Sequence, residues 1–230
     1  MPTTAGRAAN VRWRTVPVAA ALLAAVGLAG CSVGVPDPGA APSVPGTAAV
    51  ATPTITPGHD AAAVAAADLP FSAGETLAPG VPVGLSDALK DAPGWRPVKV
   101  DVAGENQFVK TDGCLVSARV NTGQSALVRG DDHESTQALF EYLDPTILPG
   151  YLKTAALRWG GEPSEPARTV EVLVLERPPA ADGRAVAVLA RLFSAAGSSV
   201  YISVSCPDTA SLTAARADVH QFLPVLPPSD

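Results

Sequence analysis

The chain has 230 residues and a formal net charge of −6, from 22 acidic and 16 basic side chains. This length fits one domain of about 150 residues together with accessory segments. The acidic balance argues against nucleic acid or an anionic lipid surface as a partner, because phosphates attract basic side chains.

The first 30 residues have the three parts of a secretory signal. Arginines at positions 7, 12 and 14 precede an apolar run from Val16 to Ala29, and no acidic residue comes before Asp37. The run of about 14 residues fits a signal peptide, whereas a membrane-spanning helix needs about 20. We therefore expect a signal peptide over residues 1–30.

The signal ends in Leu28-Ala29-Gly30-Cys31, where one apolar and two small residues lead into a cysteine. This stretch resembles the lipobox of bacterial lipoprotein precursors. The resemblance implies cleavage before Cys31 and a thioether-linked diacylglycerol on its sulfur, and two acyl chains give stable membrane anchoring. We expect a protein held on the extracytoplasmic face of the cell membrane, with a net charge of −9 once the three signal arginines are removed. An ordinary cleaved signal and an uncleaved anchor helix are the alternatives.

Residues 31–80 are predicted to form a disordered tether rich in Ala, Pro and Thr. Prolines are scattered through the segment, and large apolar side chains are too few to build a core. An extended spacer of this kind would hold the following domain clear of the membrane. Within it, the Ala-rich run after Asp60 favours a short helix.

Residues 81–230 are predicted to form a globular domain that begins with a short helix and three strands. The helix covers residues 86–90, and the valines at 98, 100 and 102 predict a strand with one buried face. A short strand follows at 107–110. The clearest strand covers residues 114–121, whose apolar face consists of Cys114, Val116, Ala118 and Val120.

A helix is predicted from Asp131 to Leu143. Its spacing places four residues inward, namely Ala138, Leu139, Tyr142 and Leu143. The spacing over 149–159 favours a second helical piece, although the same residues also alternate passably as a strand.

The C-terminal part is predicted to contain three strands and a helix. The strands cover 169–176, 185–194 and 199–206, and the second is nearly all apolar, as expected of a central strand covered on both faces. The helix begins at Asp208 and ends near Phe222. Its buried stripe consists of Leu212, Ala215, Val219 and Phe222.

This order of elements predicts an α+β domain, an antiparallel sheet with helices packed on it. The order, the Gly94-Trp95 entry and the Leu148-Pro149-Gly150-Tyr151 corner resemble the PsbP-like domain of LpqN-type envelope lipoproteins from high-GC Gram-positive bacteria. The resemblance implies a noncatalytic envelope module. A cysteine pair is not typical of that group.

Cys114 and Cys206 are the only pair left in the exported domain, and an oxidising compartment favours a disulfide between them. Both lie on the apolar face of a predicted strand, Cys114 at the start of one and Cys206 at the end of the other. If the two strands are antiparallel neighbours, these ends meet.

One cluster carries possible metal ligands: Asp131, Asp132, His133 and Glu134. They could hold a divalent cation, but acidic residues at a helix start also cap backbone N–H groups, and we favour that role. The chain shows no Gly-x-Ser-x-Gly motif, Cys-x-x-Cys pair or phosphate loop, so we predict no catalytic residue and no cofactor.

Three functions stay open. The first is a lipid-anchored binding or scaffolding module for an envelope protein, glycan or lipid, and this is the one we favour. The second is an extracytoplasmic hydrolase with dispersed catalytic residues. The third is a sensor or assembly factor of a membrane complex, for which an exposed apolar patch would be the indication.

Overall fold

A computed structural model describes residues 60–161, 168–179 and 183–228, which belong to one compact unit. The expected signal peptide, Cys31 and the tether up to residue 59 lie outside the described residues. Among the described residues, no helix has both the length and the apolar character needed to cross a membrane.

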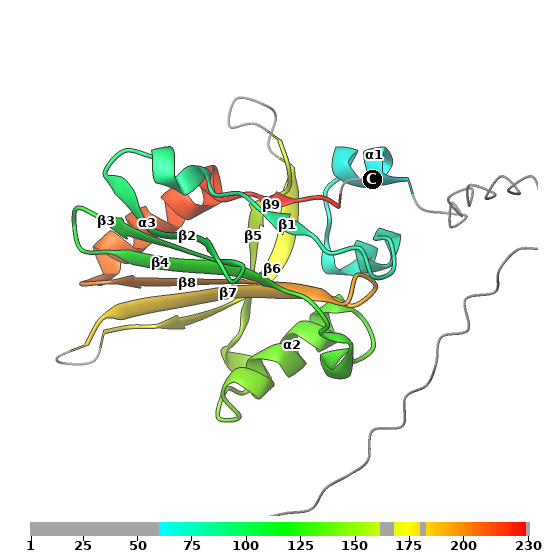
Figure 1. Ribbon diagram of the computed structural model, residues 1–230. Helices are drawn as coiled ribbons and strands as arrows, with labels where there is room; N and C mark the ends of the chain where they lie inside the picture. The colour runs from blue at the N-terminus through cyan, green and yellow to red at the C-terminus, as the bar shows by residue number, and fades with distance from the viewer. Residues whose placement is uncertain (1–59, 162–167, 180–182, 229–230) are drawn as a thin grey trace, which may run out of the picture. The chain divides into compact units, whose positions relative to one another are not determined.

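The unit is built on a seven-stranded sheet in the order β2-β3-β4-β8-β7-β6-β5, with every neighbouring pair antiparallel (Figure 1). The strands are β2 Trp95–Val102, β3 Glu105–Lys110, β4 Leu115–Asn121, β5 Lys153–Arg158, β6 Thr169–Arg177, β7 Ala185–Phe193 and β8 Ser198–Cys206. Two short strands, β1 Gly84–Leu85 and β9 Val225–Leu226, form a separate antiparallel pair.

Helices lie on both faces of the sheet. The helix α3, Thr209–Phe222, packs on one face, and α2, Asp132–Leu143, packs on the other (Figure 1). A short helix, α1, covers Ala61–Ala66. The described residues also contain four short 3-10 helices: η1 Phe71–Thr76, η2 Ala88–Asp91, η3 Ser125–Leu127 and η4 Pro149–Tyr151. The predicted α+β class is confirmed.

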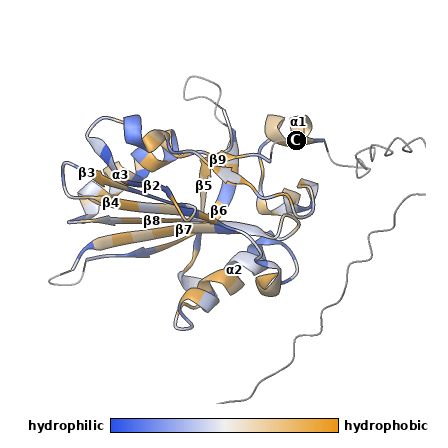
Figure 2. Cartoon of the chain, in the orientation of Figure 1, coloured by the Kyte–Doolittle hydropathy of each residue, from blue (hydrophilic) through white to orange (hydrophobic). Residues whose placement is uncertain are grey.

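The larger core lies between the sheet and α3. Asp208, where the helix was predicted to begin, caps it by accepting a hydrogen bond from the backbone N–H of Ser211 at 2.8 Å. Leu212, Ala215 and Val219 are buried against the sheet, and Phe222 packs at the edge of the same core. Figure 2 shows hydrophobic residues along β4 and β7, in the middle of the sheet.

The predicted disulfide joins Cys114 to Cys206, with Cα atoms 4.2 Å apart. The geometry anticipated from the alternating pattern is confirmed, because β4 pairs antiparallel with β8 and Leu115 lies opposite Ser205. Both sulfurs are in the core under α3.

The packed part of the chain begins before residue 81. Residues 60–80 fall within the expected tether, yet Leu69, Phe71 and Leu77 are buried. Leu69 is hydrogen-bonded to β6 through the Thr169 carbonyl and the Glu171 N–H. The short helix expected after Asp60 is present as α1, and Asp60 caps it.

Three local predictions are wrong. The valines of β2 are exposed by 47–56% rather than buried, because β2 is an edge strand whose pairing with β3 shifts register twice. Residues 149–159 form η4 and strand β5 instead of a helix, since pairing with β6 overrides the helical spacing. In α2, Tyr142 is 72% exposed, and the buried stripe lies instead at Asp132, Ser135, Thr136, Leu139 and Phe140.

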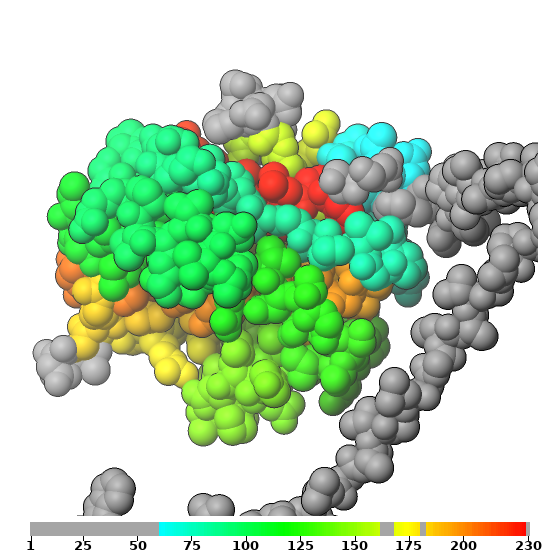
Figure 3. Space-filling view, viewed as in Figure 1, coloured from blue at the N-terminus to red at the C-terminus, as the bar shows by residue number. Residues whose placement is uncertain are grey.

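Figure 3 shows the result at the surface, where residues of η2, β2 and β3 (green) form a broad face beside α2 (yellow-green). This leaves the edge of the sheet exposed along β2.

Candidate functional site

The four candidate metal ligands at the start of α2 do not converge. Asp131 caps the helix through the N–H of Glu134 at 2.9 Å, which confirms the favoured role. Asp132 is buried under the helix, and His133 lies edge-on to the Phe71 ring with centroids 5.0 Å apart. Among the described residues, no group of three or more His, Cys, Asp or Glu side chains could hold a metal ion.

Asp132 instead forms a buried ion pair with Arg191 of β7. Its Oδ2 accepts from Nε at 3.0 Å and from Nη2 at 2.7 Å, and both side chains are fully buried. Its Oδ1 accepts from the N–H and hydroxyl of Ser194, at 2.8 and 2.6 Å. The pair therefore ties the start of α2 to the end of β7.

The remaining guanidinium donors of Arg191 bond to backbone carbonyls. Nη1 donates to Leu69 at 2.7 Å and to Glu171 at 3.1 Å, and Nη2 donates to Pro70 at 3.1 Å. Burial lowers the pKa of Arg191, and the Asp132 carboxylate opposes that shift. This arrangement joins residues 69–70, β6, β7 and α2 at one point, and Arg191 has a structural role there.

A pocket opens at the other end of α2. It arises because α2 is shorter than the strand β7 on which it packs. The helix has 12 residues, or about 18 Å, whereas β7 has nine residues, or about 30 Å. Leu192 and Ala190 are covered by α2, but Val188 and Val186 lie beyond its end and are only half-buried. The uncovered part of the sheet forms the floor of the pocket.

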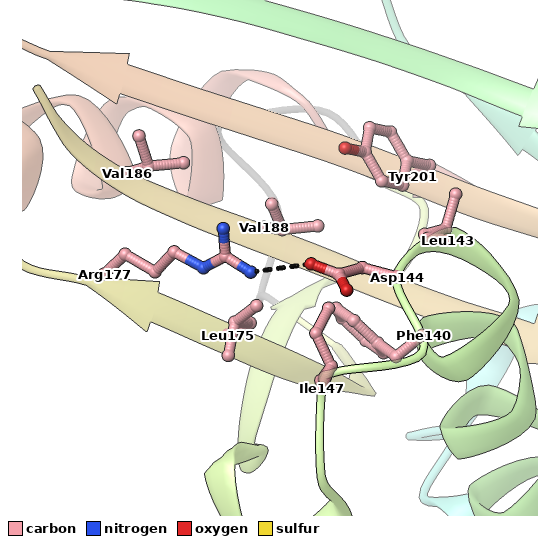
Figure 4. Close-up of a pocket in the computed structure, with 9 residues that line it drawn as sticks. All are labelled: Phe140, Leu143, Asp144, Ile147, Leu175, Arg177, Val186, Val188 and Tyr201. Atoms are coloured by element: carbon pink, nitrogen blue, oxygen red, sulfur yellow. Dashed lines mark hydrogen bonds and ion pairs between the residues drawn. The ribbon is translucent and has the colours of Figure 1, made fainter.

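The pocket has a volume of about 240 Å³ and a mainly apolar lining (Figure 4). The apolar side chains come from α2, β6, β7 and the segment after α2. They are Phe140, Leu143, Ile147, Leu175, Val186 and Val188, joined by Tyr201 from β8. Figure 4 shows these side chains pointing toward a common space.

The polar side of the pocket is the ion pair of Arg177 and Asp144, with Nη2 to Oδ2 at 3.2 Å (Figure 4). Asp144 Oδ1 also accepts from the Thr146 hydroxyl at 2.6 Å and the Thr146 N–H at 3.0 Å. The Thr146 hydroxyl and N–H, followed by Arg177, hold the pKa of Asp144 below its ordinary value. The Arg177 side chain is 58% exposed, so its other donors face solvent.

Such a pocket can bind a ligand with an apolar group and a polar head. Apolar walls with a few placed polar groups are the usual composition of small-molecule sites. The volume is slightly below the usual range of about 300–1,000 Å³, which limits the occupant to a short chain or one ring.

Comparisons with protein-family models, curated proteins and solved structures found no match for this chain. The resemblance to LpqN-type envelope lipoproteins therefore stays a prediction.

Sequence reasoning did not find this pocket. Its residues come from four separate elements and the segment that follows α2, and each apolar one is indistinguishable from a core residue in the sequence. One signal in the sequence could have pointed to the pocket, namely Arg177 at the end of a predicted strand and followed by two prolines. Nothing in the sequence indicates that Arg177 pairs with Asp144.

Proposed function

We propose that this protein is a noncatalytic binding module, anchored to the extracytoplasmic face of the cell membrane through a lipid on Cys31. The pocket at the end of α2 supports this function. Its apolar floor provides binding energy, and the exposed donors of Arg177 provide a contact for a polar or anionic head group. The lipobox resemblance of residues 28–31 supports the location.

The size of the pocket sets the size of the ligand. A water molecule occupies about 30 Å³ of liquid and a methylene group is of similar size, so 240 Å³ holds about eight methylene groups. Burying one methylene contributes about 0.8 kcal/mol, which is a factor of about four in affinity.

Straight-chain carboxylates provide a direct test. We expect affinity to rise up to about fourfold per added carbon from butanoate to octanoate and then to level off, as measured by titration calorimetry on the full chain. Val188→Trp should reduce octanoate binding at least tenfold, because the indole fills the pocket floor.

The matched control is Val100→Trp, the same change at an exposed position of β2 outside the pocket. Unchanged binding in both variants, or affinity that rises with chain length without limit, would mean that these probes adsorb elsewhere and that the pocket is not the site.

The location has its own test. Cys31→Ala should shift the protein from the membrane fraction to the soluble exported fraction, because the residue that accepts the diacylglycerol is lost. Fractionation with immunodetection measures the shift, and Cys114→Ala, which leaves residues 28–31 intact, is the control. A Cys31→Ala protein that remains membrane-bound after a salt wash would contradict lipid anchoring at this residue.

A further inference from the structure

A second concave surface lies on the outer side of α2, with a volume of about 380 Å³. We call it the outer groove. One wall is the helix stripe Glu134, Gln137, Ala138 and Glu141, and the other is the apolar segment 145–152 that returns alongside the helix. Ile147 lines both this groove and the pocket at the end of α2, so its side chain lies between the two.

The four residues of the stripe lie on one side of α2. Positions i, i+3, i+4 and i+7 share one side of a helix, and this side is distinct from the buried one at Ser135, Thr136, Leu139 and Phe140. The stripe is therefore not needed for packing against the sheet.

The stripe carries two carboxylates, Glu134 and Glu141. Within the described parts of the chain, neither Glu134 nor Glu141 takes part in an ion pair. The nearby cation, Arg129, donates through Nη1 to the carbonyls of Ala126 and Val128 at 3.3 and 2.9 Å. Its charge is held at one end of the groove.

The opposite wall carries an exposed apolar side chain. Leu148 lines the groove and is 55% exposed, and Tyr151, whose N–H bonds to the Leu148 carbonyl, lies outside the lining and is 59% exposed. Aromatic and aliphatic side chains beside a cleft are typical anchors at protein interfaces.

From this combination we propose that the outer groove binds a basic, extended peptide segment of a partner protein. Two cationic side chains pair with Glu134 and Glu141, and an apolar side chain between them contacts Ala138 and Leu148. The acidic net charge of the chain would steer such a segment toward the groove.

The spacing of the carboxylates specifies the spacing of the cations. Seven residues of helix separate Glu134 from Glu141, a rise of about 10.5 Å. A peptide in the extended polyproline II conformation advances about 3.1 Å per residue with three residues per turn, so basic residues three positions apart lie on the same side, about 9 Å apart. The preferred motif is basic-apolar-x-basic.

The test uses fluorescein-labelled ten-residue peptides with a Lys-Leu-Ser-Lys centre, and versions in which the two lysines are separated by zero to five residues. Fluorescence anisotropy with the full chain should give the tightest binding at two intervening residues. Glu134→Gln/Glu141→Gln should weaken that binding about tenfold and reduce its dependence on salt. Leu148→Ser should weaken it severalfold.

Glu75→Gln/Asp91→Asn is the matched control, because it removes two exposed carboxylates elsewhere on the domain. All substituted positions are exposed, so thermal unfolding should change little in every variant, with the largest shift for Glu134→Gln, which removes an acid from the first turn of α2. The proposal is overturned by equal weakening in the control or by affinity independent of lysine spacing. It is also overturned if Leu148→Ser instead changes sedimentation as a dimer or binding to phosphatidylcholine vesicles, which would assign the surface to a second copy or to the membrane.

Discussion

Asp132→Asn is expected to lower the free energy of unfolding by about 3–5 kcal/mol. The substitution keeps the size of the side chain but removes the carboxylate that, among the described residues, is the only one bonded to the guanidinium of Arg191, which has no contact with solvent. An unpaired buried charge costs this much because water cannot replace the lost partner. Urea unfolding followed by circular dichroism measures the change.

Asp131→Asn is the control for this prediction. It makes the same chemical change one residue away, but Asp131 is an exposed N-cap, and asparagine caps a helix as well as aspartate does. We expect a change within about 0.5 kcal/mol. A loss below about 1 kcal/mol in Asp132→Asn would show that the carbonyls of Leu69, Pro70 and Glu171 suffice to stabilise Arg191.

The double variant Asp132→Asn/Arg191→Met separates the pair from its surroundings. Replacing a buried ion pair by residues that carry no charge is often close to neutral, because neither charge is then desolvated. We therefore expect the double variant to be more stable than Asp132→Asn alone. If the two effects simply add, the charges are not coupled across the interface between α2 and β7.

The Arg191–Asp132 pair also shows where sequence reasoning ends. The strand at 185–194 was predicted from its apolar composition, and β7 has the predicted place in the sheet. A lone arginine in such a strand indicates that a buried acid must lie nearby. Which acid it is depends on the packing of α2, 59 residues earlier, and local patterns do not contain that information.

At the edge of the sheet, the strand itself was predicted correctly but its burial was not. The alternation of Val98, Val100 and Val102 predicts a buried face, and the strand does form. Its burial was predicted wrongly because position in the sheet, rather than alternation, decides which faces are covered. Asp101 and Ala103 also adopt positive φ values of 50° and 55°, which break the alternation near the end of β2.

The candidate sites were less predictable than the fold. Alternation specified β4 and β8 well enough to bring Cys114 and Cys206 together, because each strand covers one face of the core. The pocket and the outer groove depend instead on the length of α2 and on the return of segment 145–152 beside it. These are relations between elements, and they appear only when the elements are packed.

Removal of the disulfide by Cys114→Ala/Cys206→Ala is expected to lower the free energy of unfolding by about 4 kcal/mol. The bond spans a sequence separation of 92 residues, and closing a loop of about this length restricts the unfolded chain by that amount. Because the bond lies just beyond the first pair of β4 and β8, Leu115 and Ser205, the native sheet keeps its register without it, so the loss should appear as a lower urea midpoint.

Reduction provides the control for this second prediction. Dithiothreitol should lower the stability of the wild-type protein to near that of the double variant and should leave the variant unchanged, since the variant has no bond to break. Alkylation of the unfolded, unreduced protein should modify neither Cys114 nor Cys206. Modification of either residue would show that the bond is absent in the exported protein, and the stability of β4 and β8 would then rest on their hydrogen bonds and on the core under α3.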